Sequence, residues 1–232
     1  GWILDGEKTF VLDGSAADLL VVAARTAGAP GDRDGLTLFV VERDAAGVSV
    51  EPLAMVDSRG AARVRFAAVT VPTADVLGAP DRGADLLDAL VERATTALTA
   101  EMLGAADAVF RTTIEYLKQR HQFGVAIGSF QALKHRAAHM FCELELTRSV
   151  VRAALVAIDR ATPDAAALVS AAKARASDTF TLVSAEAIQM HGGIGVTDDL
   201  DVGLYYKRAK VAELTFGAPA YHRDRFARLH AF

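Results

Sequence analysis

Hydrophobic residues change their spacing partway along the chain. Up to Val71 they form short runs rich in β-branched and aromatic residues, separated by turn residues such as Asp13-Gly14. These runs cover residues 9–12, 19–23, 36–41 and 63–66. The pattern predicts a small antiparallel β domain.

The later part of the chain has the spacing of helices. Residues 72–83 contain Pro72, Gly78, Pro80 and Gly83 and are expected to form a linker. Residues 85–119 are Ala-rich and predict a long helix. A second helix is predicted by apolar positions at three-and-four spacing, namely Phe130, Leu133, Ala137, Met140, Leu144, Thr147 and Val151.

A third long helix is expected to begin at Thr162-Pro163, with a hydroxyl cap and a proline in the first turn, and to run to Gly192. Long helices with short connections favour an antiparallel four-helix bundle. The sequence therefore predicts an α+β protein, with a β domain at residues 1–78 and a helical bundle at residues 79–232.

Composition narrows the function classes. Hydrophobic residues make up 52% of the chain, enough for a sizeable core, and the formal net charge of −4 with scattered basic residues excludes nucleic acid as a partner. No run reaches the roughly 18 uncharged apolar residues of a membrane span. The single cysteine, Cys142, is expected in the helical core, and its lack of a disulfide partner indicates a cytoplasmic protein.

Two segments carry candidate chemistry. The first is Arg120-His121-Gln122-Phe123-Gly124 followed by Phe130-Gln131, and the second is residues 189–195, of sequence Gln-Met-His-Gly-Gly-Ile-Gly. Taken singly, each is also typical of ordinary helix termination by glycine. No spacing of His, Cys or acidic residues indicates a metal site.

Together and in this order, the two segments resemble the two flavin-binding signatures of the acyl-CoA dehydrogenase family. The resemblance covers most of the chain, with residues 1–8 similar to the entry to the family's middle β domain and residues 86–232 similar to its C-terminal helical domain. The family's N-terminal helical domain is absent from this sequence. Because the chain opens at Gly1 and runs directly into strand-like sequence, we expect that an earlier part has been removed.

The resemblance implies FAD as the cofactor, bound at an interface between subunits. Arg120 would supply a cationic fork for the pyrophosphate, and the glycines would let the backbone approach it. In the β domain, Phe10 and Leu12 occupy the place of residues that face the flavin ring in the family, although both are equally compatible with a sheet core. The implied cofactor-binding residues are Phe10, Leu12, Arg120, Gln122, Phe123, Phe130, Gln131, Gln189, Gly192 and Gly193.

The expected catalytic carboxylate is missing. Removal of the α-proton of an acyl-CoA requires a positioned base, and the two positions at which the family carries a glutamate correspond to Phe216 and Ala94. Glu92 and Glu101 remain as weak candidates, since Glu92 is about 200° around the helix from Ala94. Arg93 and Gly217 are candidate contacts to the substrate.

Three hypotheses follow. The chain is part of a dehydrogenase that passes electrons from acyl-CoA through FAD to an electron-transfer flavoprotein, with its base displaced. Alternatively, it is a non-catalytic subunit of a homo- or heterotetramer that shares FAD with a catalytic partner, as in subunits of actinobacterial type for steroid or other bulky acyl-CoA degradation. The third hypothesis, an interaction scaffold without flavin, is disfavoured by the retention of both signatures.

Overall fold

A computed structural model describes residues 1–231. The chain divides into two compact units, Gly1–Leu90 and Val91–Phe232, each of which is described by itself. The division falls within helix α1 (Ala84–Gln119).

The first unit is built from two antiparallel sheets. Strands β1 (Trp2–Leu12), β5 (Ala61–Val71) and β4 (Val48–Pro52) form one sheet in that order, and β2 (Leu19–Arg25), β3 (Leu36–Glu42) and β6 (Val76–Leu77) form the other. Alternating apolar residues of these strands share a core around fully buried Phe39, against which the Trp2 ring packs edge-on at 5.7 Å. The antiparallel β domain is confirmed.

All four predicted runs lie within strands, but two strands of this unit were missed. Strand β4 is short, lies at the edge of its sheet and ends at Pro52, so its alternation is too brief to recognise. Strand β6 follows a single turn of 3₁₀ helix, η1 (Thr73–Asp75), inside the predicted linker. Its two residues pair with β3.

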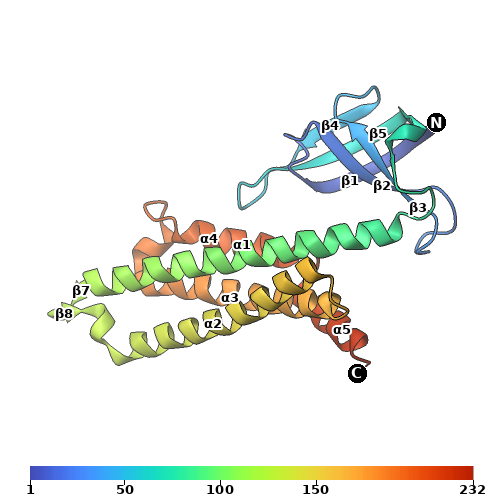
Figure 1. Cartoon of the computed structure of the whole chain (residues 1–232). Helices are drawn as coiled ribbons and strands as arrows, with labels where there is room; N and C mark the ends of the chain where they lie inside the picture. Colours follow the sequence, from blue (N-terminus) through green and yellow to red (C-terminus); the bar gives the residue numbers. More distant parts are fainter. Residues whose placement is uncertain (232) are drawn as a thin grey trace. The chain divides into compact units, whose positions relative to one another are not determined.

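The second unit is a helical bundle (Figure 1). Its long helices are α1, α2 (Gln131–Arg160) and α3 (Ala165–His191), followed by the shorter α4 (Val202–Leu214) and α5 (Pro219–Leu229). The connections contain β7 (His121–Gln122), β8 (Val125–Ala126) and the 3₁₀ turns η2 (Ile127–Ser129) and η3 (Gly192–Val196). No helix in residues 1–231 is long and apolar enough to cross a membrane.

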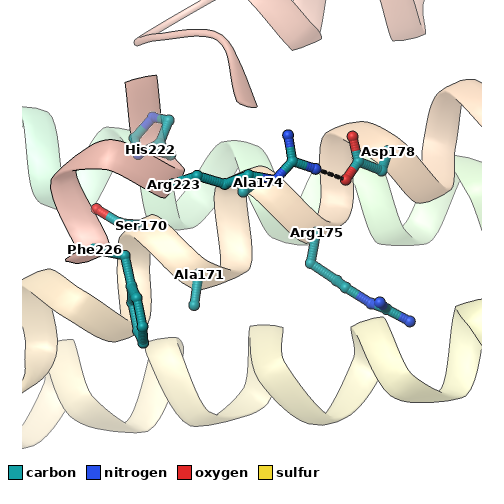
Figure 2. Close-up of a pocket in the computed structure, with 8 residues that line it drawn as sticks. All are labelled: Ser170, Ala171, Ala174, Arg175, Asp178, His222, Arg223 and Phe226. Carbon is teal, nitrogen blue, oxygen red and sulfur yellow. Dashed lines mark hydrogen bonds and ion pairs between the residues drawn. The ribbon is translucent and has the colours of Figure 1, made fainter. Parts of the chain in front are cut away.

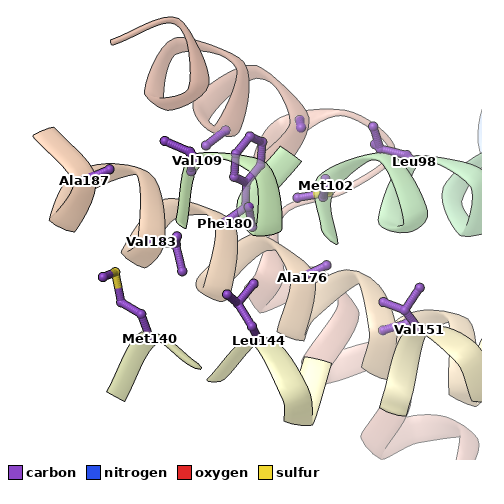
Figure 3. Packing of buried hydrophobic residues seen from close by; sticks show 14 of the residues in the cluster. Leu98, Met102, Val109, Met140, Leu144, Val151, Ala176, Phe180, Val183 and Ala187 are labelled. Carbon is purple, nitrogen blue, oxygen red and sulfur yellow. The ribbon is translucent and has the colours of Figure 1, made fainter. Parts of the chain in front are cut away.

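Helix α3 lies at the centre of the bundle core (Figure 3). Phe180 of α3 is buried in the same cluster as Met102 and Val109 of α1, Leu144 of α2 and Ala209 of α4. The four-helix bundle of the predicted α+β fold is therefore confirmed, with α5 as an added fifth helix.

Two local predictions were wrong. Cys142 is exposed, because it lies on the side of α2 opposite the buried stripe that contains Met140 and Leu144. Thr162 does not cap α3: the helix begins at Ala165, and the buried Thr162 hydroxyl has no hydrogen-bond partner among the described residues.

Candidate functional site

The helix end that precedes the first signature segment contacts the second segment at one end of the bundle. Tyr116, in the last turns of α1, donates a hydrogen bond from its hydroxyl to the backbone oxygen of His191, the last residue of α3, at 3.2 Å. The two rings also stack, with centroids 4.3 Å apart. This contact links the end of the helix that precedes Arg120 to the start of the Gly192 turn.

The backbone of the Gly192 turn suits close approach by a ligand. Gly192 has φ 66° and ψ −143°, a conformation that favours glycine. A Cβ at Gly192 or Gly193 would meet no atom within 4 Å, so these two residues face open space. At Gly195, by contrast, a Cβ would lie 2.6 Å from the Ile188 backbone oxygen, so this glycine is required for packing.

Arg120 is exposed, and no residue in the described part of the chain pairs with its guanidinium. The backbone of Arg120, however, is held by two hydrogen bonds. Its N–H donates to the backbone oxygen of Tyr116 at 2.9 Å, and its backbone oxygen accepts from the N–H of Ile127 at 2.8 Å. A cation on a fixed backbone, with no internal partner, is available to an anionic ligand such as a pyrophosphate.

The residues that follow Arg120 form a two-stranded hairpin with an exposed aromatic tip. Phe123 is 90% exposed with φ 53°, and its ring lies edge-on to that of Phe130 at 6.1 Å. Among the predicted contacts, Gln122, Gln131 and Gln189 are also exposed. The predicted cofactor-binding residues of the bundle are therefore exposed to solvent and do not form part of its core.

In the β unit, Phe10 and Leu12 are 61% and 53% exposed, so neither belongs to the sheet core. The β1–β5 pairing shifts register between Lys8 and Val11, and Phe10 within this bulge has φ 54°. A bulge of this kind re-aims a side chain away from the regular alternation. The aromatic ring is therefore available to a flat ligand.

The Phe216–Gly217 turn between α4 and α5 has φ values of 58° and 109°. Phe216 is partly buried against the bundle core. Buried His222 lies 3.0 Å, through Nε2, from the Phe216 oxygen, and burial lowers the pKa of His222 to about 4. His222 also lines a cavity of about 290 Å³ between α3 and α5 (Figure 2), in which Arg223 is paired with Asp178.

Each of the two candidate bases, Glu101 and Glu92, is paired with an arginine. Glu101 accepts hydrogen bonds from Arg208 at both carboxylate oxygens, at 2.8 and 3.0 Å. Glu92 is paired with Arg225, which also donates to the Ser170 hydroxyl at 2.8 Å. Both carboxylates thus connect α1 to other helices of the bundle.

The two positions expected to carry a base, Phe216 and Ala94, are each partly buried. Arg93, beside Ala94, is exposed, and Gly217 is held by close contacts, since a Cβ there would lie 2.6 Å from the Tyr221 ring. Within residues 1–231, no group of three His, Cys, Asp or Glu side chains is placed to hold a metal ion.

Sequence reasoning missed Tyr116, Lys173 and His222. Lys173 is fully buried and donates to the Gly217 backbone oxygen at 2.9 Å. Its one signal is a lone charge within the Ala-rich segment 171–174 of a buried helix. Tyr116 contacts a backbone oxygen 75 residues away in the sequence, and His222 contacts the backbone oxygen of Phe216, six residues before it. Neither contact is recorded by a sequence motif.

The chain matches two family profiles. Residues 1–69 match the middle domain of acyl-CoA dehydrogenase, and residues 81–230 match its C-terminal domain. Acyl-CoA dehydrogenase IpdE2 of Mycolicibacterium smegmatis is 35% identical over 224 residues, which cover 96% of this chain and 60% of that protein.

Solved structures agree with these matches. A glutaryl-coenzyme A dehydrogenase in complex with glutaryl-CoA has a TM-score of 0.95 at 27% identity, covering 99% of this chain and 59% of that one. An FAD complex of PigA has a TM-score of 0.93 at 25% identity, covering 100% and 61%. This chain therefore spans about three fifths of the length of each of these proteins.

The low pKa of His222 predicts a loss of stability in acid. The unfolded chain binds a proton near the ordinary pKa of about 6.5, whereas the folded protein resists protonation down to about pH 4. Stability is therefore present above about pH 6.5 and is lost as the pH falls toward 4. Thermal unfolding midpoints at about pH 7 and pH 5 measure this loss.

The matched variant is His222→Gln, which keeps an N–H donor for the Phe216 oxygen but does not titrate. It should lose less stability than the wild type over the same interval. Equal losses in the two proteins would show that His222 is not the group responsible.

Proposed function

Because this chain belongs to the acyl-CoA dehydrogenase family, we propose that it takes part in the FAD-dependent α,β-dehydrogenation of acyl-CoA thioesters. The observation that carries the proposal is the contact between Tyr116, one helical turn before Arg120, and His191 of the second signature segment. This contact brings an unpaired cation and an open glycine turn to one end of the bundle.

The residues present fit FAD on physical grounds. Arg120 offers a guanidinium to the pyrophosphate, and Gly192 and Gly193 leave open space where side chains would otherwise project. Phe123 and Phe130 offer apolar faces, and Gln122, Gln131 and Gln189 offer amide groups for orientation. When bound, FAD supplies the acceptor for the hydride that leaves the acyl chain.

Phe10 and Leu12 are proposed as the β-unit contacts to the flavin. Both are exposed, and the bulge at Phe10 gives that ring a direction outside the sheet core. Leu12 lacks a hydroxyl group and contributes only apolar contact.

By resemblance to the family, the bundle residues would bind the FAD of a neighbouring subunit in a homo- or heterotetramer, with an electron-transfer flavoprotein as acceptor. The single thiol favours a cytoplasmic location.

A second candidate function is a non-catalytic, FAD-sharing subunit of a heteromeric dehydrogenase. The pairing of Glu92 with Arg225 and of Glu101 with Arg208 favours it. A carboxylate that already accepts hydrogen bonds from a guanidinium would have to leave that pair before it could take a proton from a substrate, and leaving a partly buried pair costs stability. With Phe216 and Ala94 at the expected positions, the base would then come from the partner subunit.

Arg120→Ala should weaken FAD binding. Loss of a charge-assisted contact costs about 1.5 to 3 kcal/mol, equivalent to roughly 10- to 100-fold in Kd. Flavin retained after gel filtration and the Kd for added FAD measure the effect. The matched control is Arg111→Ala, on the same helix and 75% exposed, which should bind FAD as the wild type does. Unchanged flavin occupancy in Arg120→Ala would remove Arg120 from the site.

Glu101→Gln should leave the chemistry nearly intact. If the base lies elsewhere, the rate of flavin reduction by acyl-CoA in the assembled protein changes by less than about tenfold, whereas loss of a general base costs about 10²- to 10⁴-fold. Stopped-flow absorbance under anaerobic conditions gives this rate. Glu115→Gln, which alters an exposed pair with Lys118, is the control. A loss of about a hundredfold or more would instead identify Glu101 as the base.

A further inference from the structure

The Phe216–Gly217 turn adopts an unusual backbone. Two consecutive residues have positive φ, and the first of them is a bulky phenylalanine. Such residues are strained and persist only where the surrounding structure imposes the conformation. The close packing around Gly217 contributes to this constraint, because a Cβ there would lie within 3.0 Å of both Tyr221 and His222.

Lys173 holds the turn from inside the bundle. Its side chain is fully buried, and its ammonium donates to the backbone oxygens of Gly217 at 2.9 Å and Glu213 at 3.0 Å, with the Ser177 hydroxyl at 3.3 Å. No carboxylate in the described chain forms an ion pair with it. Its main partners are thus carbonyl groups at the end of α4 and in the turn.

His222 holds the preceding carbonyl. Its Nε2 lies 3.0 Å from the Phe216 oxygen, and because a carbonyl only accepts, Nε2 must carry the proton. The other ring nitrogen, Nδ1, is buried with no partner in the described residues. The two consecutive carbonyls of the turn are therefore each held by a buried side chain from a different helix, α3 and α5.

We propose that Lys173 and His222 are positioning residues for the acyl-CoA site, holding the Phe216–Gly217 turn so that the side chain at position 216 keeps a fixed place against the substrate. The inference rests on the proposed function, which puts this turn at the acyl site. Neither residue touches the substrate itself, and each acts through a backbone oxygen of the turn.

A purely stabilising role for Lys173 fits less well. Burial lowers the pKa of Lys173 to about 8, with the charge of Glu213 opposing this shift. Burial therefore costs the ammonium its hydration, and the hydrogen bonds to the Gly217 and Glu213 oxygens offset part of that cost. What the ammonium adds is a defined conformation of the turn.

Other charged groups face this site. They are Glu213 with its partner Lys210 from α4, His222 and Arg225 from α5, and Glu92 of α1 through its pair with Arg225. Burial lowers the pKa of His222 to about 4, so its ring is neutral above about pH 7, and the hydrogen bond to Glu213 raises the pKa of Lys210 above its ordinary value. Lys173, by contrast, has a pKa of about 8 because it is buried.

The test measures acyl-CoA affinity in the FAD-loaded protein assembled with its partner subunit. The probes are butyryl-CoA, isobutyryl-CoA and glutaryl-CoA under anaerobic conditions, with the flavin spectrum as readout. Lys173→Met should weaken the tightest-binding probe by about tenfold, because a turn that holds its binding conformation for only about a tenth of the time lowers the apparent affinity by that factor. The control, Lys210→Met, removes the same charge near the end of α4 without touching the turn and should bind normally.

A second readout needs no variant. Wild-type affinity should fall as the pH rises through about 8, because a neutral amine makes weaker hydrogen bonds than an ammonium, and the Lys173→Met profile should be flat. A flat wild-type profile, or unchanged affinity in a folded Lys173→Met, would overturn the positioning role. Absence of binding by the wild type to every probe would contradict the proposed function itself, and this inference with it.

Discussion

The close packing of helices around α3 is the constraint on which the bundle unit depends. Small residues of α3, including Ala172, Ala176 and Ala187, are fully buried or nearly so, which allows α1, α2 and α4 to approach its backbone. The far end of α3 then meets α1 through the Tyr116–His191 contact. Core packing and this contact therefore hold the helix ends from which Arg120 and Gly192 follow.

Helix α3 also connects the two candidate sites of the bundle. Lys173 projects from α3 to the turn between α4 and α5, so the two candidate sites of the bundle, at the Gly192 turn and at Phe216, share one rigid element. The acidic residues of α1, in contrast, connect helices: Glu92 binds Arg225 of α5 and Glu101 binds Arg208 of α4. Breaking such partly buried pairs costs stability, which is a structural reason for these acids to be present.

Sequence patterns predicted elements better than contacts between them. The stripe at Met140, Leu144 and Val151 identified α2 and its buried face because helical periodicity is a local property. The edge strand β4 depends on its pairing with β5, which periodicity does not encode, whereas the exposure of Cys142 follows from its place opposite the buried stripe of α2. Likewise, the signatures around Arg120 and Gly192 were recognisable, whereas their link through Tyr116 and the burial of Lys173 required the tertiary structure.

The most direct test of the account is an anaerobic titration of the purified protein with acyl-CoA thioesters, alone and with its candidate partner subunit, followed by the visible absorbance of the flavin. Bleaching is expected in the assembled complex and not with this chain alone, because the candidate carboxylates of this chain are held in ion pairs. Bleaching by this chain alone would place a competent base on it. Absence of bleaching in the assembled complex would contradict the claim that the chain serves acyl-CoA dehydrogenation.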